Sequence, residues 1–280
     1  MSYVLNSGAK IPNVGFGVWE APQDETSKLV EIALQSGYRH IDTAKCYDNE
    51  KESADGIAKF LKENKEVSRK DVFYTSKIWL DEFGYEKAKK AVQKSVDAAS
   101  SIEYIDLLLL HGPEPPANLR LGAYKALQEA VAEGKVKNIG VSNYAVHHLE
   151  ELLNWPELKI KPAVNQVEIN PWLQRDDIAQ FCKKNNILIE AYSPLMRGER
   201  LDDPALVALA KKYNKSVAQV LVRWNLQKGF LPLPKSATAS RIKSNIDVYD
   251  FELSEEDFES LGDINSYFVA GGNWDPTKWE

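Results

Sequence analysis

Apolar and polar positions recur along the chain with two different periods. Short runs of apolar, β-branched and aromatic residues are followed by longer segments whose apolar residues return every three or four positions. The first kind of run predicts strands, at 14–18, 39–42, 72–77, 105–111, 137–142, 163–168, 187–192 and 230–234. The second kind predicts helices, at 25–35, 50–65, 85–99, 123–133, 146–154, 176–185, 204–213, 216–227, 239–248 and 254–264.

Eight apolar strands that alternate with helices indicate a parallel sheet with helices outside it. Eight repeats in 280 residues suit a (β/α)₈ TIM barrel, which we expect to form a single domain over residues 1–280. Residues 3–14 predict an N-terminal hairpin, and the segments after the last strand predict extra C-terminal helices. An open doubly wound sheet is the alternative, but it should carry a G-x-G-x-x-G turn, and Gly15-Phe16-Gly17 lacks the third glycine.

Composition indicates which classes of partner and which cellular compartment the protein does not suit. The formal net charge of −6 leaves no basic excess for a general nucleic-acid binder. The only cysteines are Cys46 and Cys182, which favours a reducing compartment over a disulfide framework. The chain opens without a signal-peptide pattern, and no apolar run approaches the roughly 18–20 residues that span a bilayer. We therefore expect a cytoplasmic protein that binds neither nucleic acid nor membrane and is a monomer, with a weak dimer left open.

Polar side chains stand at the ends of the predicted strands, where the chemistry of such barrels lies. Caps of the following helices explain the serines there about as well as a functional role does. Lysine, histidine, glutamine and tyrosine are not capping residues, so those positions indicate a site. The strand ends carry Trp19, Asp42, Lys77, His111, Ser142, Asn143, Gln166, Tyr192, Ser193, Lys235 and Ser236.

A carboxylate, a phenol and an ammonium are predicted to meet at this mouth. Lys77 requires an anion, because burying an unpaired charge is costly, and Asp42 is its obvious partner. A purely structural ion pair is the alternative. Tyr47 adds a phenol whose reference pKa of about 10 is too high for easy proton transfer. We expect the neighbouring ammonium to lower that pKa and make Tyr47 a general acid. His111 could bond the same substrate oxygen, or be a buried histidine satisfied by the backbone.

These four residues and the segments around them resemble the aldo-keto reductase family. The resemblance extends from the opening hairpin to the last helix, in the order of the family's own pattern. Its segments are GFGVW (15–19), HIDTAKCYDNE (40–50), TSKIW (75–79), DLLLLH (106–111), GKVKNIGVSN (134–143), NQVEINPW (165–172), AYSPL (191–195) and LPKSATASRIKSN (233–245).

The resemblance implies a carbonyl reductase that uses NADPH. Tyr47 would give the proton to the carbonyl oxygen, with its pKa lowered by Lys77, and Asp42 would hold Lys77. His111 would orient the carbonyl, and the hydride would come from the reduced nicotinamide. The implied cofactor contacts are Ser142, Asn143 and Gln166 to the carboxamide, Tyr192 stacked on the nicotinamide, Lys235, Ser236 and Arg241 at the 2′-phosphate, Asn245 at the adenine, and Ser193 and Leu195 as further contacts.

Two local features refine this expectation. Lys235 and Arg241 make a basic clamp in an acidic chain, which predicts NADPH over NADH, although an ordinary solvated pair is the alternative. Many relatives carry an aromatic residue after the histidine and an acid before the adenine-contacting asparagine. This chain has Gly112 and Ser244 there, so we expect one pocket wall to be missing and the adenine contact to be weaker. The expected open pocket, suited to small aldehydes, α-keto esters and diketones, is rimmed by Trp19, Trp79 and Trp274.

Two other classes of protein are weighed against the reductase. A regulatory protein with the nucleotide site but vestigial turnover would have no need of an intact acid. A metal-dependent barrel hydrolase would need several His or carboxylate ligands at the strand ends, where only Asp42 and His111 stand. His147-His148 lacks the spacing of a metal pair on one helix face. No metal is therefore expected.

Overall fold

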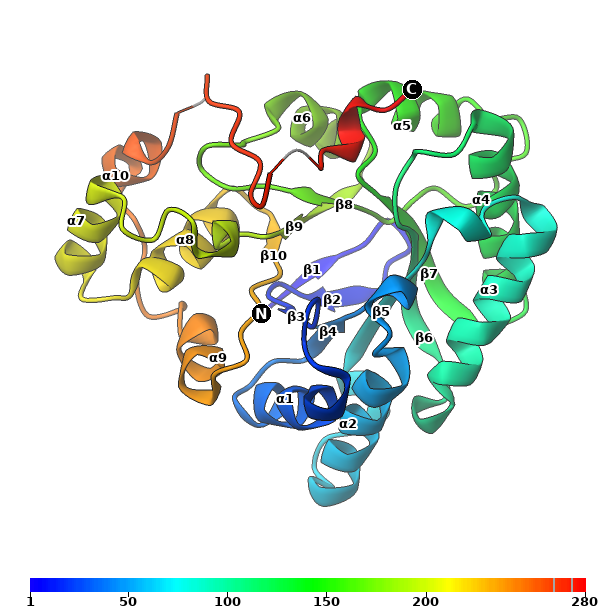
Figure 1. The fold of residues 1–280 in the computed structure, drawn as a ribbon, viewed down its shortest axis with the longest axis horizontal. Coiled ribbons are helices and arrows are strands. Elements are labelled where there is room, and N and C mark those ends of the chain that lie inside the picture. The colour runs from blue at the N-terminus through cyan, green and yellow to red at the C-terminus, as the bar shows by residue number, and fades with distance from the viewer. Residues whose placement is uncertain (264, 273) are drawn as a thin grey trace.

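The computed structural model describes residues 1–263, 265–272 and 274–280 as a ring of parallel strands surrounded by helices (Figure 1). Eight parallel strands follow one another in chain order from β3 to β10. Gly15 N donates to Pro232 O at 3.0 Å and Gly17 N to Pro234 O at 3.2 Å, so the first and last strands also pair. The sheet is therefore a closed (β/α)₈ barrel, which confirms the predicted fold class and excludes the open sheet.

The barrel strands are short, and an antiparallel hairpin of β1 and β2 precedes them. The strands are β1 (Ser2–Val4), β2 (Lys10–Pro12), β3 (Phe16–Gly17), β4 (His40–Asp42), β5 (Phe73–Ile78), β6 (Ile105–Leu110), β7 (Val136–Ser142), β8 (Val164–Glu168), β9 (Leu188–Tyr192) and β10 (Leu231–Pro232). The helices are α1 (Gln23–Gln35), α2 (Glu50–Glu63), α3 (Tyr85–Ala98), α4 (Ala117–Ala132), α5 (Val146–Leu153), α6 (Asp176–Lys184), α7 (Pro204–Tyr213), α8 (Val217–Gln227), α9 (Ala239–Ile246) and α10 (Glu255–Ser260).

Two helices differ from the prediction by more than two residues at one end. Helix α4 begins six residues earlier than expected and runs through Gly122, a residue of low helix propensity. The glycine is needed there because a Cβ atom on Gly122 would lie 3.0 Å from Tyr85 N of α3. Helix α10 ends at Ser260, because Leu261 is extended and Gly262 has a left-handed φ of +83°. The predicted end of this helix, Ile264, lies outside the described residues.

An apolar plug fills the amino-terminal end of the barrel interior. Leu5 and Ile11 from the hairpin pack with inward-facing Phe73, Leu107 and Leu231 of the strands. Because side chains alternate across a strand, the next inward positions on the same strands lie closer to the carboxyl ends. There the interior turns polar, and His40 Nε2 lies 2.8 Å from Thr75 Oγ1. The polar site is thus held above an apolar floor.

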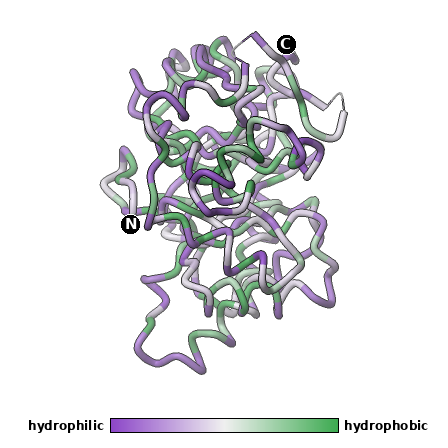
Figure 2. Tube along the Cα trace, turned by 90° about the vertical axis from the view of Figure 1, so that its left-hand side faces the viewer, coloured by the Kyte–Doolittle hydropathy of each residue, from purple (hydrophilic) through white to green (hydrophobic). Residues whose placement is uncertain are grey.

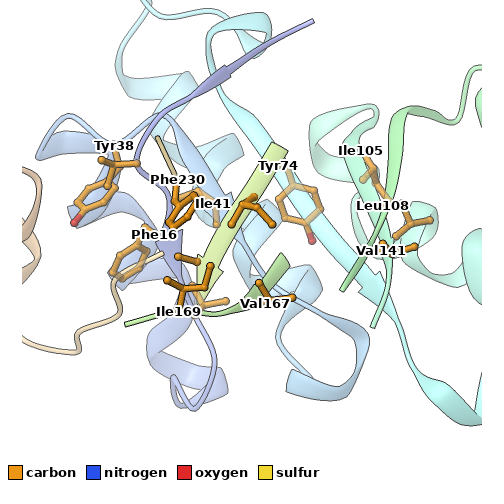
Figure 3. Packing of buried hydrophobic residues seen from close by; sticks show 14 of the residues in the cluster. Phe16, Tyr38, Ile41, Tyr74, Ile105, Leu108, Val141, Val167, Ile169 and Phe230 are labelled. Carbon is orange, nitrogen blue, oxygen red and sulfur yellow. The ribbon is translucent and has the colours of Figure 1, made fainter. Parts of the chain in front are cut away.

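The larger core lies between the outer face of the barrel and the helices. Residues from successive strands, among them Ile41, Tyr74, Leu108 and Val141, form one continuous layer (Figure 3). This layer explains why the strand sequences are apolar on both faces. Hydrophobic and hydrophilic residues alternate along most of the chain trace (Figure 2), as expected for helices that bury one face only.

Candidate active site

One cleft at the carboxyl ends of the strands collects the predicted site residues. It has a volume of about 760 Å³. Every residue predicted for catalysis, cofactor binding or the substrate pocket lines it, except Lys77, which lies beneath. The lining includes Trp19, Asp42, Tyr47, Trp79, His111, Ser142, Asn143, Gln166, Tyr192, Ser193, Leu195, Lys235, Ser236, Arg241, Asn245 and Trp274.

Lys77 is a fully buried cation on β5, with none of its surface exposed. Its Nζ donates to Asp42 Oδ1 at 2.7 Å and to the carbonyl oxygen of Thr43 at 2.8 Å. A third contact reaches Tyr47 Oη at 3.4 Å. These three acceptors match the three N–H donors of an ammonium group. The ion pair and the phenol predicted from the strand ends therefore lie side by side.

Tyr47 is half-buried at the end of the short 3₁₀ helix Lys45–Tyr47 that follows β4. Burial raises the pKa of Tyr47 well above its usual value, and the charge of Asp42 raises it further. The pKa of Tyr47, expected to be low, is therefore raised in the protein without ligand, whereas a lowering by Lys77 itself stays a prediction. The physical reason is that the Asp42 carboxylate balances the ammonium charge while burial penalises the phenolate. The phenol therefore holds its proton near neutral pH.

His111 follows β6 and faces Tyr47, with the two ring centres 5.7 Å apart. Trp79 packs edge-on against the other side of the imidazole at 4.9 Å. Burial lowers the pKa of His111 well below its usual value, and the nearby Lys77 charge lowers it further. Cys46 Sγ lies 3.6 Å from Nδ1 of the ring. A neutral imidazole at this place can hydrogen-bond a substrate oxygen without adding a charge.

A linked group of amides and hydroxyls continues the cleft along β7 to β9. Ser142 Oγ donates to the backbone oxygen of Gln166 at 2.7 Å. Asn143 Nδ2 donates to the backbone oxygen of His111 at 3.0 Å, and its Oδ1 accepts from Tyr192 Oη at 2.9 Å. The last bond fixes the Tyr192 ring in the cleft wall, so this side chain presents a flat aromatic surface.

The far end of the cleft is basic. Lys235 and Arg241 both line it, and neither has a carboxylate within 4 Å in the described part of the chain. Lys235 Nζ donates only to the backbone oxygen of Glu20, at 3.2 Å. Asn245 is buried beside them on α9. Cations without carboxylate partners at one end of a cleft fit an anionic ligand group such as a phosphate.

Two further side chains belong to the site but were not predicted. Glu190, on β9, is completely buried and accepts from Gln166 Nε2 at 2.8 Å. An acid inside an apolar strand is a sequence signal that could have marked it. Arg197 lines the cleft with its guanidinium 4.2 Å from the centre of the Trp19 ring. Its place depends on the loop after β9, which has no periodic sequence pattern.

The space beside Gly112 is occupied by residues from other parts of the chain, and none of them lines the cleft. A Cβ atom at Gly112 would lie 3.3 Å from Leu80 and 3.6 Å from Trp279, which comes from the C-terminal tail. Trp279 in turn packs edge-on against Trp274 at the rim. The tail therefore places one tryptophan, Trp274, at the cleft and a second, Trp279, behind it next to Gly112.

In residues 1–263, 265–272 and 274–280, no three His, Cys, Asp or Glu side chains gather closely enough to hold a metal ion. Every helix in that part of the chain is too short or too polar to traverse a bilayer.

Fold and cleft together define a (β/α)₈ barrel oxidoreductase whose cleft lies at the carboxyl ends of the strands. The chain belongs to the aldo/keto reductase family, whose sequence pattern matches residues 13–266. An uncharacterized oxidoreductase of Saccharomyces cerevisiae is 45% identical over 279 residues, covering 99% of this chain and 96% of that protein.

Two more comparisons agree with this assignment. The glyoxal reductase of Bacillus subtilis is 42% identical over 272 residues, covering 97% of this chain and 95% of that protein. The crystal structure of a Bombyx mori aldo-keto reductase in complex with NADP superposes with a TM-score of 0.86 and 34% identity, covering 92% of this chain and 91% of that one. The expectation of an aldo-keto reductase is therefore confirmed.

Proposed function

We propose that the protein reduces aldehydes and ketones to alcohols with NADPH, and that Asp42, Tyr47, Lys77 and His111 carry the chemistry. One observation supports this above the others. The Lys77 ammonium contacts both Asp42 and Tyr47 beneath a cleft that runs on to the unpaired cations Lys235 and Arg241. A phenol, a buried cation and an anion-binding end in one cleft suit reduction of a carbonyl by a phosphorylated dinucleotide.

The cleft offers a place for each part of such a cofactor. Lys235, Ser236 and Arg241 would hold the 2′-phosphate, and Asn245 the adenine. Ser142, Asn143 and Gln166 would hold the carboxamide, and the Tyr192 ring would stack on the nicotinamide, with Ser193 and Leu195 as further contacts. Arg197 adds a third cation to the cleft lining, which suits the negatively charged diphosphate. When bound, the reduced nicotinamide supplies the hydride.

Tyr47 is the proton donor in this proposal. Because its pKa is raised, the phenol is protonated at neutral pH and can donate a hydrogen bond to a carbonyl oxygen. As the oxygen gains negative charge it becomes more basic than the phenolate, and the proton moves from Tyr47 Oη to it. Lys77 then stabilises the phenolate, and neutral His111 orients the carbonyl by a hydrogen bond. Asp42 keeps the ammonium in place.

The proposed substrates are small activated carbonyl compounds, such as α-keto esters, diketones and small aldehydes. The rim formed by Trp19, Trp79 and Trp274 offers apolar surface and few polar groups that would select one substrate. The similarity to a protein named glyoxal reductase agrees with a dicarbonyl substrate. We expect the protein to act on free small molecules as a monomer in the cytoplasm, within a single domain over residues 1–280.

Replacing Tyr47 by phenylalanine tests the proposed acid. The ring remains and the proton is lost, so turnover should fall by at least about 10²-fold while the Kd for NADPH stays within twofold. The measurement is NADPH absorbance loss over a carbonyl panel, with cofactor binding followed by tryptophan fluorescence. Near wild-type turnover in Tyr47→Phe would show that another group gives the proton.

Replacing Lys235 by methionine tests the phosphate end. The variant should bind NADPH about tenfold or more weakly and NADH almost unchanged, because only NADPH carries the 2′-phosphate. Lys243→Met on α9 is a matched control, since Lys243 does not line the cleft. Equal losses for both cofactors would place the 2′-phosphate elsewhere.

A further inference from the structure

Glu190 is a buried carboxyl group that the proposed reaction leaves unused. It lies on β9 opposite Gln166 of β8, with none of its surface exposed. Its Oε2 accepts from Gln166 Nε2 at 2.8 Å, whereas Oε1 is buried and has no hydrogen-bond partner. A group of this kind costs stability, because a buried polar atom without a partner is unfavourable. Its presence beneath the cleft therefore calls for another explanation.

An ionised Glu190 would lack a cation partner in the part of the chain that the structure describes. Lys77 is already paired with Asp42 at 2.7 Å, and no cation lies within 4 Å of Glu190 in the described residues. Burial raises the pKa of Glu190 to about 8, and the Asp42 carboxylate contributes to the rise. The side chain is therefore a neutral carboxyl near pH 7. A neutral carboxyl stabilises the Lys77 ammonium only weakly. The interaction through which Glu190 can act is therefore its hydrogen bond to Gln166.

That hydrogen bond controls how the Gln166 amide is turned. The same Gln166 nitrogen lies 2.8 Å from Asp42 Oδ2 and 2.8 Å from Glu190 Oε2. Asp42 is an acceptor because it pairs with Lys77, so the Gln166 atom that faces it must be the NH₂ group. Both N–H bonds then point to the carboxyl groups below. Gln166 lines the cleft, and its Oε1 is left as the acceptor on that side.

We propose that Glu190 is a positioning residue of the nicotinamide subsite: with Asp42 it engages both N–H bonds of Gln166 and so presents Gln166 Oε1 to the N–H of the cofactor carboxamide. This inference rests on the proposed function. The inference extends the proposed function by assigning a role to a residue that touches neither cofactor nor substrate. Removing the Glu190 acceptor frees one N–H bond of Gln166, so the amide group can rotate. Gln166 Oε1 then no longer faces the cleft reliably, and the carboxamide N–H of the cofactor loses its acceptor.

The test compares three ligands on three variants. NADP⁺ carries the carboxamide, its 3-acetylpyridine analogue has a methyl ketone in place of the amide, and 2′,5′-ADP lacks the nicotinamide half. Glu190→Leu removes the acceptor, and Glu190→Gln keeps a neutral acceptor of the same length. Ile189→Ala is the matched control, because Ile189 is buried on the same strand but belongs to the outer core. Dissociation constants are measured by tryptophan fluorescence on the full chain.

The expected result is a selective loss. Glu190→Leu should bind NADP⁺ about tenfold more weakly, the value of one good hydrogen bond, while its Kd for the acetylpyridine analogue and 2′,5′-ADP stays within twofold. Glu190→Gln should regain most of the NADP⁺ affinity. Ile189→Ala should leave the ratio of NADP⁺ to analogue affinity unchanged, even if the variant is less stable.

Other outcomes overturn the inference. If Glu190→Leu keeps its preference for NADP⁺ over the analogue, Glu190 does not position Gln166. If all three ligands lose affinity together, or if Ile189→Ala alters the ratio in the same way, the role of Glu190 is structural. If the wild-type chain itself binds NADP⁺ no better than 2′,5′-ADP, the nicotinamide contributes nothing, and the proposed function fails with the inference.

Discussion

At the scale of single residues, the site depends on a cation that has no exposed surface. A buried ion pair such as Lys77–Asp42 is weak evidence for stability, because desolvation offsets much of the attraction. Its third contact, to Tyr47 Oη, gives it a chemical use, since the ammonium can stabilise a phenolate. The raised pKa of Tyr47 in the protein without ligand agrees with a phenol that stays protonated until the substrate oxygen becomes basic enough to accept the proton.

Lys77→Met should separate the chemical role of the ion pair from its structural role. Loss of the ammonium leaves Asp42 as an uncompensated buried carboxylate, so the free energy of unfolding should fall by about 3–5 kcal/mol. Turnover of the folded variant should fall by at least about 10²-fold. Denaturant unfolding and single-turnover NADPH oxidation measure the two effects.

Lys125→Met is the control for Lys77→Met, because Lys125 pairs with Glu157 on the surface and its loss should change neither quantity appreciably. A Lys77→Met enzyme with wild-type single-turnover rates would remove Lys77 from the mechanism.

Glu190 makes stability depend on pH, with a definite sign. Its pKa is about 8 in the folded chain against an ordinary value of 4.5, with Asp42 and Lys77 as the charged groups facing it. From about pH 4.5 to 8 the folded state keeps a proton that the unfolded chain has lost, so this carboxyl lowers stability progressively as pH rises. Glu190→Gln removes the effect. Relative to wild type, the variant should gain more than about 1 kcal/mol between pH 5 and pH 8 in urea unfolding. A constant difference would contradict the raised pKa.

At the scale of elements, the loop after β9 is the irregular part that shapes the cleft. Ser193, Met196 and Arg197 all have left-handed φ values, of 47°, 52° and 52°. Such conformations cost about 1–3 kcal/mol each for non-glycine residues and persist where the surroundings impose them. Met196 is completely buried and anchors the loop. The anchored loop places the Arg197 guanidinium over Trp19 at the cleft.

Arg197→Met tests whether this loop serves the diphosphate. Both NADPH and NADH carry that group, so the variant should weaken both by a similar factor of about tenfold, in contrast to Lys235→Met. The measurement is the pair of dissociation constants for the two cofactors. A selective loss of NADPH would instead assign Arg197 to the 2′-phosphate, and unchanged constants would leave it without a role in cofactor binding.

At the scale of the whole molecule, the C-terminal tail returns across the barrel and completes the rim. Arg175 Nη2 donates to Asp275 Oδ1 at 2.7 Å, and its Nη1 donates to Tyr267 Oη at 2.6 Å. The Arg175 and Asp275 side chains are each 6% exposed, so this pair is shielded from water. It fixes the segment next to Trp274. The tail therefore contributes to the lining of the cleft although it lies far in sequence from Asp42, Tyr47, Lys77 and His111.

Arg175→Met should release the tail. Asp275 loses its buried cation partner and keeps only the exposed Lys278, so the free energy of unfolding should fall by about 3 kcal/mol, and proteolysis after residue 266 should speed up. KM for aromatic carbonyl substrates should rise several-fold more than KM for the smallest aldehydes, because Trp274 and Trp279 lose their support. Lys278→Met is the control, since Lys278 is exposed and 3.9 Å from Asp275. Unchanged proteolysis in Arg175→Met would show that other contacts hold the tail.

Much of this architecture could be predicted from local pattern, and the exceptions have physical causes. The eight strands follow from apolar runs, and Asp42, Lys77 and His111 follow from polar residues at strand ends. The start of α4 was missed because Gly122 reads as a helix breaker, while its close contact with Tyr85 of α3 requires a glycine. The family match is confirmed, whereas the individual site roles stay predictions.

The sequence by itself determined the period of strands and helices, the fold class and which polar side chains stand at the strand ends, because these depend on patterns along the chain. Only the tertiary structure decided how those side chains behave. Burial and the Asp42 charge raise the pKa of Tyr47, Glu190 accepts a hydrogen bond from the amide of Gln166, and Trp279 fills the space beside Gly112. Desolvation and packing depend on residues that are distant in sequence, so the local sequence pattern does not predict them.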